Sequence, residues 1–379
     1  MTRPLKVMTI VGTRPEVIRL AAVIRRFDDH VDHVLVHTGQ NYDHTLNQVF
    51  FDDLGLRAPD HVLDIDTSSL GRVLGTVVIE TERVLLAEAP DAVVVLGDTN
   101  SCVAAVVAKR MRIPVFHLEA GNRSFDENVP EETNRRLVDH VADYALVYTE
   151  HARRNLLAEG IHPSRILLTG SPMREVLDSA ADGIASSDVL AREGLEPGRY
   201  VLVSLHREEN VDDAERLTDS LDALVHLARH LDLPVLVSTH PRTRRRLDEL
   251  GGVDTTGLVF HEPFGFHDYN ALQRSAAVVV SDSGTISEEA SILGFAAVTV
   301  RDRIERPEAL DSGAIITSTL GRHALVEAVG YAMARVRDGH RPAAPDEYRI
   351  DDTSHRVVSF VLGTARSHHA RLGLRPPVR

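Results

Sequence analysis

The sequence is poor in cysteine and in long apolar runs, and both shortages narrow the classes of protein to which it can belong. Cys102 is the only cysteine among 379 residues, so an intrachain disulfide and a CxxC metal site are excluded. No apolar run approaches the roughly 20 residues that a membrane-spanning helix needs. The first residues lead into a strand-like segment without the apolar region of a signal peptide. We therefore expect a cytoplasmic enzyme with no membrane partner.

Basic residues are outnumbered as well. The chain has 42 Lys and Arg against 56 Asp and Glu, a formal net charge of −14. Because a phosphate backbone requires a basic face, no nucleic-acid partner is expected. Local arginines and helix N-termini could still bind a phosphate-bearing small molecule. The dinucleotide fingerprint GxGxxG is absent, as are clusters of metal ligands, so neither NAD nor any other cofactor nor a metal is expected.

The length and the apolar pattern predict the fold class. A chain of 379 residues exceeds the size at which one hydrophobic core usually stops growing, so two domains are expected. Most short apolar runs are continuous rather than alternating, which is typical of parallel strands covered on both faces, and helical stretches separate most of them. We predict two Rossmann-like, doubly wound parallel-sheet α/β domains, with six strands before about residue 170 and six after about 200. The predicted strands are Lys6–Val11, His33–His37, Ala92–Leu96, Ile113–His117, Tyr144–Tyr148, Ile166–Leu168, Tyr200–Leu205, Pro234–Ser238, Leu258–His261, Ala277–Ser281, Ala296–Val300 and Ala314–Ile316.

The domain boundary is predicted from composition. Asp178–Arg199 contains Ala, Gly, Ser, Asp and Pro without a strong apolar stripe, which favours a linker. We therefore expect an N-terminal domain over residues 1–177 and a C-terminal domain over residues 178–353. A helix over residues 354–379 is expected to join the N-terminal domain.

Ligands of open α/β sheets bind beyond the carboxyl ends of the strands, and these ends are unusually polar in the N-terminal half. Arg14 follows the first strand, Asp98 and Glu119 end two others, and Glu131 lies where a helix begins. Simpler readings are a capped turn at Arg14, an N-cap at Asp98 and a surface pair between Glu131 and Arg135. Several acids at one sheet edge are nevertheless costly unless they titrate, hydrogen-bond or carry out acid–base chemistry.

The C-terminal half has matching polar strand ends. His206 follows its first predicted strand and His240 its second, and a histidine there can carry a proton or bind phosphate. Ser283 and Gly284 form a small-residue turn before a helix, which suits a diphosphate, while one of the two glutamates that follow can accept hydrogen bonds from ribose hydroxyls. Arg306 belongs to a later charged segment suited to phosphate recognition, or to an exposed charged loop.

Taken together, these segments resemble the non-hydrolysing UDP-N-acetylglucosamine 2-epimerase family, which has the GT-B fold. The resemblance spans about residues 6–318 in unbroken order. The matching segments are GTRPE at Gly12–Glu16, TGQNYD at Thr38–Asp43, LGDT at Leu96–Thr99, HLEAGNR at His117–Arg123, PEETNR at Pro130–Arg135, TGSP at Thr169–Pro172, HREEN at His206–Asn210, DSGTISEEA at Asp282–Ala290 and ERPEA at Glu305–Ala309.

The resemblance implies roles for individual residues and an assembly state. It implies two domains facing a cleft, a UDP-sugar substrate and a homodimer. The implied catalytic groups are Asp98, Glu119, Glu131 and His206. The implied UDP-binding groups are Arg14, Ser283, Gly284, Glu289 and Arg306, with Arg19, Arg135 and His240 as further substrate-site candidates.

The chain departs from the family pattern at three positions. The family's UDP-N-acetylglucosamine enzymes usually have Leu where this chain has Asn122, Gly at Thr285 and Lys at Arg19. The variants resemble the branch that acts on UDP-2-acetamido-2,6-dideoxyhexoses in the L-fucosamine pathway.

The family resemblance implies elimination and re-addition of UDP through a 2-acetamidoglycal. Acid–base groups and a diphosphate clamp would suffice for this chemistry. Asp98, Glu119 and Glu131 share the acid–base work in this reading, and His206 stabilises or protonates the diphosphate. The alternatives are a GT-B glycosyltransferase, a hydrolysing epimerase and a non-catalytic sugar-nucleotide sensor.

Overall fold

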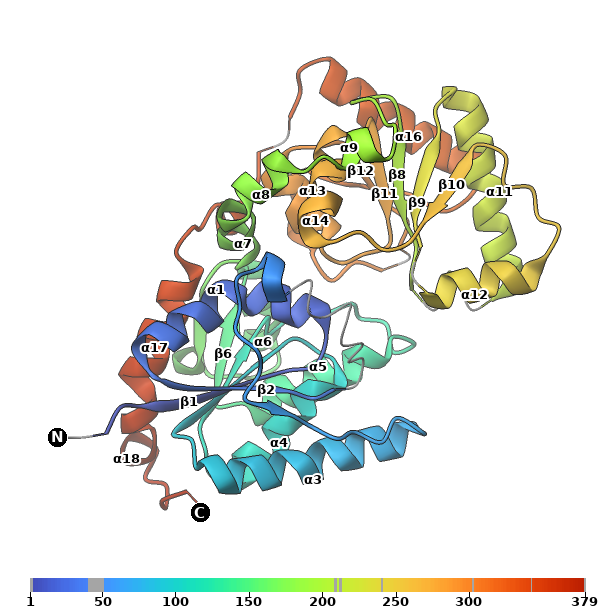
Figure 1. Ribbon diagram of the computed structural model, residues 1–379. Helices are drawn as coiled ribbons and strands as arrows, with labels where there is room; N and C mark the ends of the chain where they lie inside the picture. The colour runs from blue at the N-terminus through green and yellow to red at the C-terminus, as the bar shows by residue number, and fades with distance from the viewer. Residues whose placement is uncertain are drawn as a thin grey trace. The chain divides into compact units, whose positions relative to one another are not determined.

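A computed structural model describes residues 3–39, 51–207, 210, 213–239, 241–301, 303–341 and 343–377. The chain divides into two compact units, each built on its own sheet (Figure 1). Unit 1 comprises Met1–Ser179 and Asp346–Arg379, and unit 2 comprises Ala180–Pro345.

The described part of unit 1 contains a seven-stranded parallel sheet with the order β3-β2-β1-β4-β5-β6-β7. Its strands are β1 (Lys6–Val11), β2 (Asp32–His37), β3 (His61–Val62), β4 (Ala92–Leu96), β5 (Val115–Leu118), β6 (Tyr144–Val147) and β7 (Ile166–Leu168). The strand order reverses between β1 and β4, which is the switch point where ligands of such sheets bind. The prediction of six strands was one too few, because β3 spans two residues and leaves no apolar run in the sequence.

Helices cover both faces of this sheet. They are α1 (Arg14–His30), α3 (Leu70–Glu88), α4 (Ala104–Arg110), α5 (Pro130–Val141), α6 (Glu150–Ala158), α7 (Met173–Ser179), α17 (Thr353–Thr364) and α18 (His368–Leu372). The β4 residues Val93 and Val95 are fully buried in a core cluster that includes residues of α3 and α4. The chain's last helices return to unit 1, where α17 packs against α1 (Figure 1).

The described part of unit 2 contains a six-stranded parallel sheet with the order β10-β9-β8-β11-β12-β13. Its strands are β8 (Val201–Ser204), β9 (Val235–Ser238), β10 (Leu258–His261), β11 (Val278–Ser281), β12 (Ala297–Thr299) and β13 (Ile316–Thr317). Its helices are α8 (Ala181–Ser186), α9 (Val189–Arg192), α11 (Ala214–Leu231), α12 (Pro241–Leu250), α13 (Phe266–Ser275), α14 (Ile286–Leu293), α15 (Pro307–Asp311) and α16 (Arg322–Arg337). The switch point of this sheet lies between β8 and β11.

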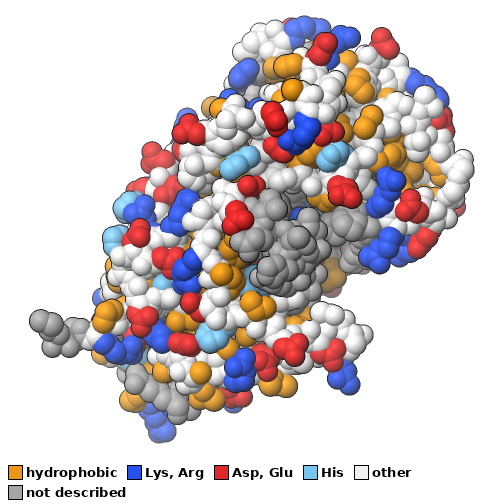
Figure 2. All heavy atoms as spheres, viewed as in Figure 1, with side chains coloured by type: hydrophobic (Ala, Val, Ile, Leu, Met, Phe, Trp, Pro, Cys, Tyr) orange, Lys and Arg blue, Asp and Glu red, His pale blue; other side chains and the backbone are white. Residues whose placement is uncertain are grey.

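Both sheets confirm the predicted fold class of two doubly wound parallel α/β domains. The inner strands of each sheet, such as β4, β5, β6 and β11, are buried on both faces because helices cover each side, which is why their apolar residues do not alternate with polar ones. On the face seen in Figure 2, acidic and basic side chains are interspersed instead of gathering into one basic patch. Among the helices of the described residues, none has the length and apolarity to cross a membrane.

Candidate active site

The turn after β1 is organised by Glu16, for which the sequence predicted no role. Glu16 is buried and accepts hydrogen bonds from the backbone N–H groups of Gly12 and Thr13 and from the hydroxyls of Thr99 and Ser101. Burial raises its pKa to about 7, and the hydrogen bonds oppose that rise. Glu16 therefore ties the β1 turn to the β4 turn across the switch point.

Glu119 occupies a backbone conformation that few side-chain-bearing residues adopt. Its φ is +63°, and non-glycine residues in this left-handed region concentrate at functional sites. One carboxylate oxygen pairs with the guanidinium of Arg19, and the other accepts a hydrogen bond from Asn122 Nδ2 at 3.2 Å. Both side chains of the ion pair are about 8% exposed. The carboxylate is thus held by both oxygens at the carboxyl end of β5.

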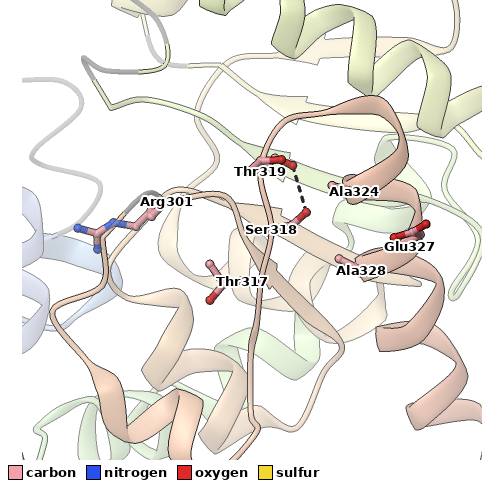
Figure 3. A pocket seen from close by; sticks show the side chains of 7 residues that line it. All are labelled: Arg301, Thr317, Ser318, Thr319, Ala324, Glu327 and Ala328. Atoms are coloured by element: carbon pink, nitrogen blue, oxygen red, sulfur yellow. Dashed lines mark hydrogen bonds between the residues drawn. The ribbon is translucent and has the colours of Figure 1, made fainter.

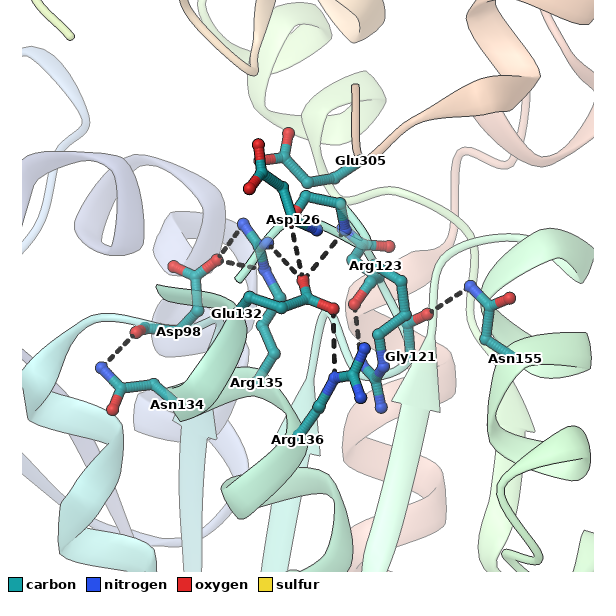
Figure 4. A network of polar contacts seen from close by, with 12 residues as sticks. Asp98, Gly121, Arg123, Asp126, Glu132, Asn134, Arg135, Arg136, Asn155 and Glu305 are labelled. Carbon is teal, nitrogen blue, oxygen red and sulfur yellow. Dashed lines mark hydrogen bonds and ion pairs between the residues drawn. The ribbon is translucent and has the colours of Figure 1, made fainter. Parts of the chain in front are cut away.

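Asp98, at the end of neighbouring β4, is held by a second arginine. Arg135 Nε donates to Asp98 Oδ2 at 2.6 Å, and Arg135 Nη1 lies 3.1 Å from Glu132 Oε2 (Figure 4). Asn134 donates to the backbone carbonyl of Asp98 at 2.9 Å. Arg135 is buried, so the reading of Glu131 and Arg135 as a surface pair is wrong. Glu131 itself lies half-buried in the first turn of α5.

Glu132 was not among the predicted site residues. Its side chain is buried and also accepts hydrogen bonds from the backbone N–H and the hydroxyl of Ser124, at 2.9 and 3.0 Å. It therefore joins the loop after β5 to the start of α5. The signal available in the sequence was its spacing of three residues from Arg135, which places both on one helix face.

Beneath these acids lies a buried ionic network. His117 Nδ1 is 2.8 Å from Asp139 Oδ1, and His117 Nε2 is 2.8 Å from the carbonyl oxygen of Gly97. Arg123 Nη1 donates to Asp139 Oδ2 at 2.7 Å, and the backbone N–H of Gly121 donates to the same oxygen at 3.1 Å. The network connects the end of β4 to the loop that carries Glu119. The sequence analysis did not predict this network.

In unit 2, the strand ends at the switch point bring His206 to a buried carboxylate. His206 Nδ1 lies 3.0 Å from Asp282 Oδ1, and the His206 side chain is 44% exposed whereas that of Asp282 is 0% exposed. Burial would raise the pKa of Asp282, but the charge of His206 and several hydrogen bonds lower it to about 2. The His206–Asp282 pair thus lies where the sequence predicted a phosphate partner or proton carrier.

The predicted phosphate turn follows Asp282 directly. Ser283 and Gly284 are partly exposed ahead of α14, and the Gly284 carbonyl accepts a hydrogen bond from Arg306 Nη1 at 2.9 Å. A side chain at Gly284 would approach this guanidinium to 2.8 Å. Arg306 Nε also pairs with the fully buried Glu288 at 3.3 Å. Arg306 is therefore buried against the turn, and the exposed-loop alternative is wrong.

Of the two α14 glutamates, Glu289 accepts a hydrogen bond from Gln273 Nε2 at 2.7 Å and is 6% exposed. Glu288 is fully buried beside Arg306, so Glu289 is the better placed of the two to meet a ligand. Arg14 is half-buried at the start of α1, where burial lowers its pKa. The other predicted histidine, His240, lies outside the described residues.

A pocket beyond β12 and β13 does not coincide with the predicted residues. Figure 3 shows Arg301 at one side of it and Glu327 at the other. Its remaining lining residues are Thr317, Ser318, Thr319, Ala324 and Ala328. Arg301 is buried and paired with Glu305. No group of His, Cys, Asp and Glu side chains suited to a metal ion occurs within the described ranges.

The sequence of the chain is similar to those of known nucleotide-sugar epimerases. The family model described as UDP-N-acetylglucosamine 2-epimerase matches residues 25–362. The chain is 37% identical to a UDP-N-acetylglucosamine 2-epimerase of Methanocaldococcus jannaschii, over 89% of this chain and 95% of the relative. It is 34% identical to a UDP-2,3-diacetamido-2,3-dideoxy-D-glucuronate 2-epimerase of Pseudomonas aeruginosa, over 87% and 93%.

Solved structures extend the likeness to the fold. A UDP-N-acetylglucosamine 2-epimerase from Rickettsia bellii is 42% identical, with a TM-score of 0.89 over 97% of this chain and 98% of that one. The Methanocaldococcus jannaschii enzyme in complex with UDP-GlcNAc and UDP is 34% identical, with a TM-score of 0.88 over 95% and 100%. The predicted GT-B fold class is thereby confirmed. The chain belongs to the UDP-N-acetylglucosamine 2-epimerase family.

Proposed function

We propose that the chain is a non-hydrolysing UDP-N-acetylhexosamine 2-epimerase. The observation that carries the proposal is the pair of carboxylates at the ends of β4 and β5. Asp98 and Glu119 are each held by an arginine, and Glu119 lies in a left-handed backbone conformation. Side chains held this firmly at a switch point suit acid–base chemistry on a bound ligand. The solved relative that holds UDP-GlcNAc and UDP supports a UDP-sugar as that ligand.

The reaction we propose is an elimination followed by the reverse addition. A carboxylate among Asp98, Glu119 and Glu131 removes the proton from C2, and the C–H electron pair forms a double bond to C1. UDP departs with the C1–O electron pair, leaving a 2-acetamidoglycal. Return of UDP to C1 and of a proton to the opposite face of C2 gives the epimer.

The leaving diphosphate needs its own stabilisation, and unit 2 has suitable groups. Ser283 and Gly284 stand before α14, whose N-terminus favours negative charge. His206 would stabilise or protonate the departing diphosphate, and Glu289 would accept hydrogen bonds from the ribose. Arg14, Arg19, Arg135 and His240 complete the proposed substrate site.

Solvent deuterium exchange tests the reaction. The wild-type protein, incubated with a UDP-N-acetylhexosamine in D₂O, should place deuterium at C2 of both epimers while the UDP-sugar is recovered intact. A glycosyltransferase or a sensor would leave C2 unlabelled. A hydrolysing epimerase would release UDP and a free sugar, so either of these outcomes overturns the proposal.

Two substrate classes are open to this site. One is the UDP-GlcNAc and UDP-ManNAc pair, and the other is a UDP-2-acetamido-2,6-dideoxyhexose. The motif variants at Asn122, Thr285 and Arg19, which resemble the second branch, favour the second class. NMR of reactions with a panel of both classes would decide, and equal or faster turnover of UDP-GlcNAc would contradict this preference.

We also propose a homodimer and a cytoplasmic location. Helix α3 exposes Ile79 and Leu86, seven residues apart on one helix face, to 62% and 49%, and exposed apolar surface of this kind can mark a protein–protein contact. Light scattering should give the mass of two chains, and Ile79→Asp should shift it toward one. A wild-type monomer at working concentration would contradict the dimer.

A further inference from the structure

The carboxylate of Asp282 is fixed from several directions. It is fully buried directly after β11, and its backbone N–H donates to the carbonyl of Ser204 at 3.2 Å. Oδ2 accepts hydrogen bonds from the backbone N–H of Arg207 and from Asn210 Nδ2, both at 3.0 Å. The backbone N–H of His206 also donates to both oxygens, at 3.1 and 3.2 Å. These donors leave the carboxylate little freedom to rotate.

The same carboxylate meets one nitrogen of the His206 ring. Oδ1 is 3.0 Å from Nδ1, and the histidine side chain is 44% exposed. A carboxylate with a low pKa can only accept a hydrogen bond, so the proton of this contact belongs to Nδ1. Nε2 is then the nitrogen of the ring available to a ligand.

We propose that Asp282 is a positioning residue that holds His206 in the Nδ1–H form and presents Nε2 to the leaving diphosphate. The catalytic consequence rests on the proposed epimerase function, whereas the form of the ring does not. In the imidazolium the second proton lies on Nε2, which can donate a hydrogen bond or that proton to the diphosphate and so return the ring to the Nδ1–H form. The imidazolium charge meanwhile faces the Asp282 carboxylate. An aspartate that orients a catalytic histidine in this way is a recurrent solution in unrelated enzymes.

The histidine of unit 1 shows why His206, and not every histidine beside an aspartate, is suited to this task. His117 also meets a buried aspartate through Nδ1, but its Nε2 lies 2.8 Å from the Gly97 carbonyl. Its side chain is 1% exposed. Both ring nitrogens of His117 are therefore used inside the protein, and that pair is structural.

Asp282→Asn should reverse the protonation of the ring. An asparagine offers one acceptor oxygen and one NH₂ group in place of two acceptor oxygens. The backbone N–H of Arg207 can only donate, whereas a neutral imidazole can exchange its donor and acceptor nitrogens. We therefore expect the amide oxygen to turn toward Arg207 and the NH₂ to face Nδ1, which moves the ring proton to Nε2.

Nitrogen NMR measures this change directly. The full-length protein, labelled with ¹⁵N-histidine, contains 20 histidines, and the His206→Gln variant identifies the signal of His206. At a pH where the ring is neutral, the wild-type signals should show a protonated Nδ1, and those of Asp282→Asn a protonated Nε2. Asn210→Ala is the matched control, since it removes a donor from Oδ2 and leaves the Oδ1 contact, and should retain the wild-type pattern.

Kinetics test the catalytic part. Asp282→Asn should lower kcat by about 10²-fold or more with KM near the wild-type value, because the imidazolium that donates to the leaving diphosphate loses its anionic partner, a loss felt mainly in the transition state. In the His206→Gln background, the same substitution should lower kcat by less than about threefold, because two residues that act as one unit are not additive. Circular dichroism confirms that each variant is folded.

Each result decides one way. A protonated Nε2 in the wild-type protein, or an unchanged pattern in Asp282→Asn, overturns the positioning role even if the enzyme is active. Multiplicative losses in the double variant also overturn it, since they indicate a role independent of His206. If Asp282→Asn does not fold, the wild-type signal and the Asn210→Ala control still decide the form of the ring. Absence of C2 exchange in the wild type refutes the proposed function and leaves the NMR test intact.

Discussion

Replacement of Glu119 by glutamine probes the acid–base chemistry most directly. The change keeps the shape of the side chain and removes its charge, so Arg19 loses the ion pair with Glu119. Loss of one partner of a buried ion pair costs roughly 3–5 kcal/mol, and we expect the lower part of this range because the amide oxygen can still accept from Arg19. The amide NH₂ then faces Asn122 Nδ2, now 3.2 Å from Oε1, unless the Asn122 amide turns.

The effect on chemistry should exceed the effect on binding. General acid–base catalysis contributes about 10²–10⁴-fold, so turnover of Glu119→Gln should fall by at least about 10²-fold. Affinity for UDP should change much less, because the proposed diphosphate groups belong to unit 2. Steady-state kinetics, calorimetry with UDP and urea denaturation measure the three quantities separately.

Glu159→Gln is a matched control for this experiment. Glu159 also pairs with an arginine of unit 1, Arg123, at 2.6 Å, but it has no proposed contact with the substrate. It should retain turnover within a few-fold of the wild type. Near-normal turnover in Glu119→Gln together with lost substrate binding would refute the reasoning, and the base would have to be sought elsewhere.

Three further substitutions test the scaffold around the site. Arg306→Ala should weaken UDP binding by about 1.5–3 kcal/mol, because the proposed charged hydrogen bond from Arg306 to the diphosphate is lost, and unchanged affinity by calorimetry would contradict the predicted role. Asp282→Asn should reduce the fall in the free energy of unfolding between pH 4 and pH 2. The pKa of the folded carboxyl, about 2, lies below its usual 3.8, so its stabilisation is present above pH 3.8 and is lost as the pH falls from 3.8 to 2. That contribution is about 2 kcal/mol, and an unaltered stability difference between pH 4 and pH 2 would refute it. Gly121→Ala should lower the denaturation midpoint strongly, because Gly121 has φ +82° and an added Cβ would collide with the backbone carbonyl of Ala152; wild-type stability would contradict this.

Local patterns in the sequence determined much of the fold. Lys6–Val11 and Ala92–Leu96 were predicted with the bounds that the structure has, because a parallel strand covered on both faces is a continuous apolar run ending in a polar turn. The strand β3, His61–Val62, was not predicted because two residues are too few to show an apolar run or an alternating pattern. The ordered motifs likewise identified the family.

The tertiary structure decided which polar groups meet. Arg19 and Glu119 are 100 residues apart in the chain, and Arg135 and Asp98 are 37 apart, so no local spacing reveals either pair. Whether an acid such as Asp282 is buried beside a histidine depends on which strands become neighbours in the sheet. Periodicity along the chain reports local burial and strand ends, whereas the partner of each charge is set by the strand order β8-β11 and β1-β4-β5, which only the folded chain establishes.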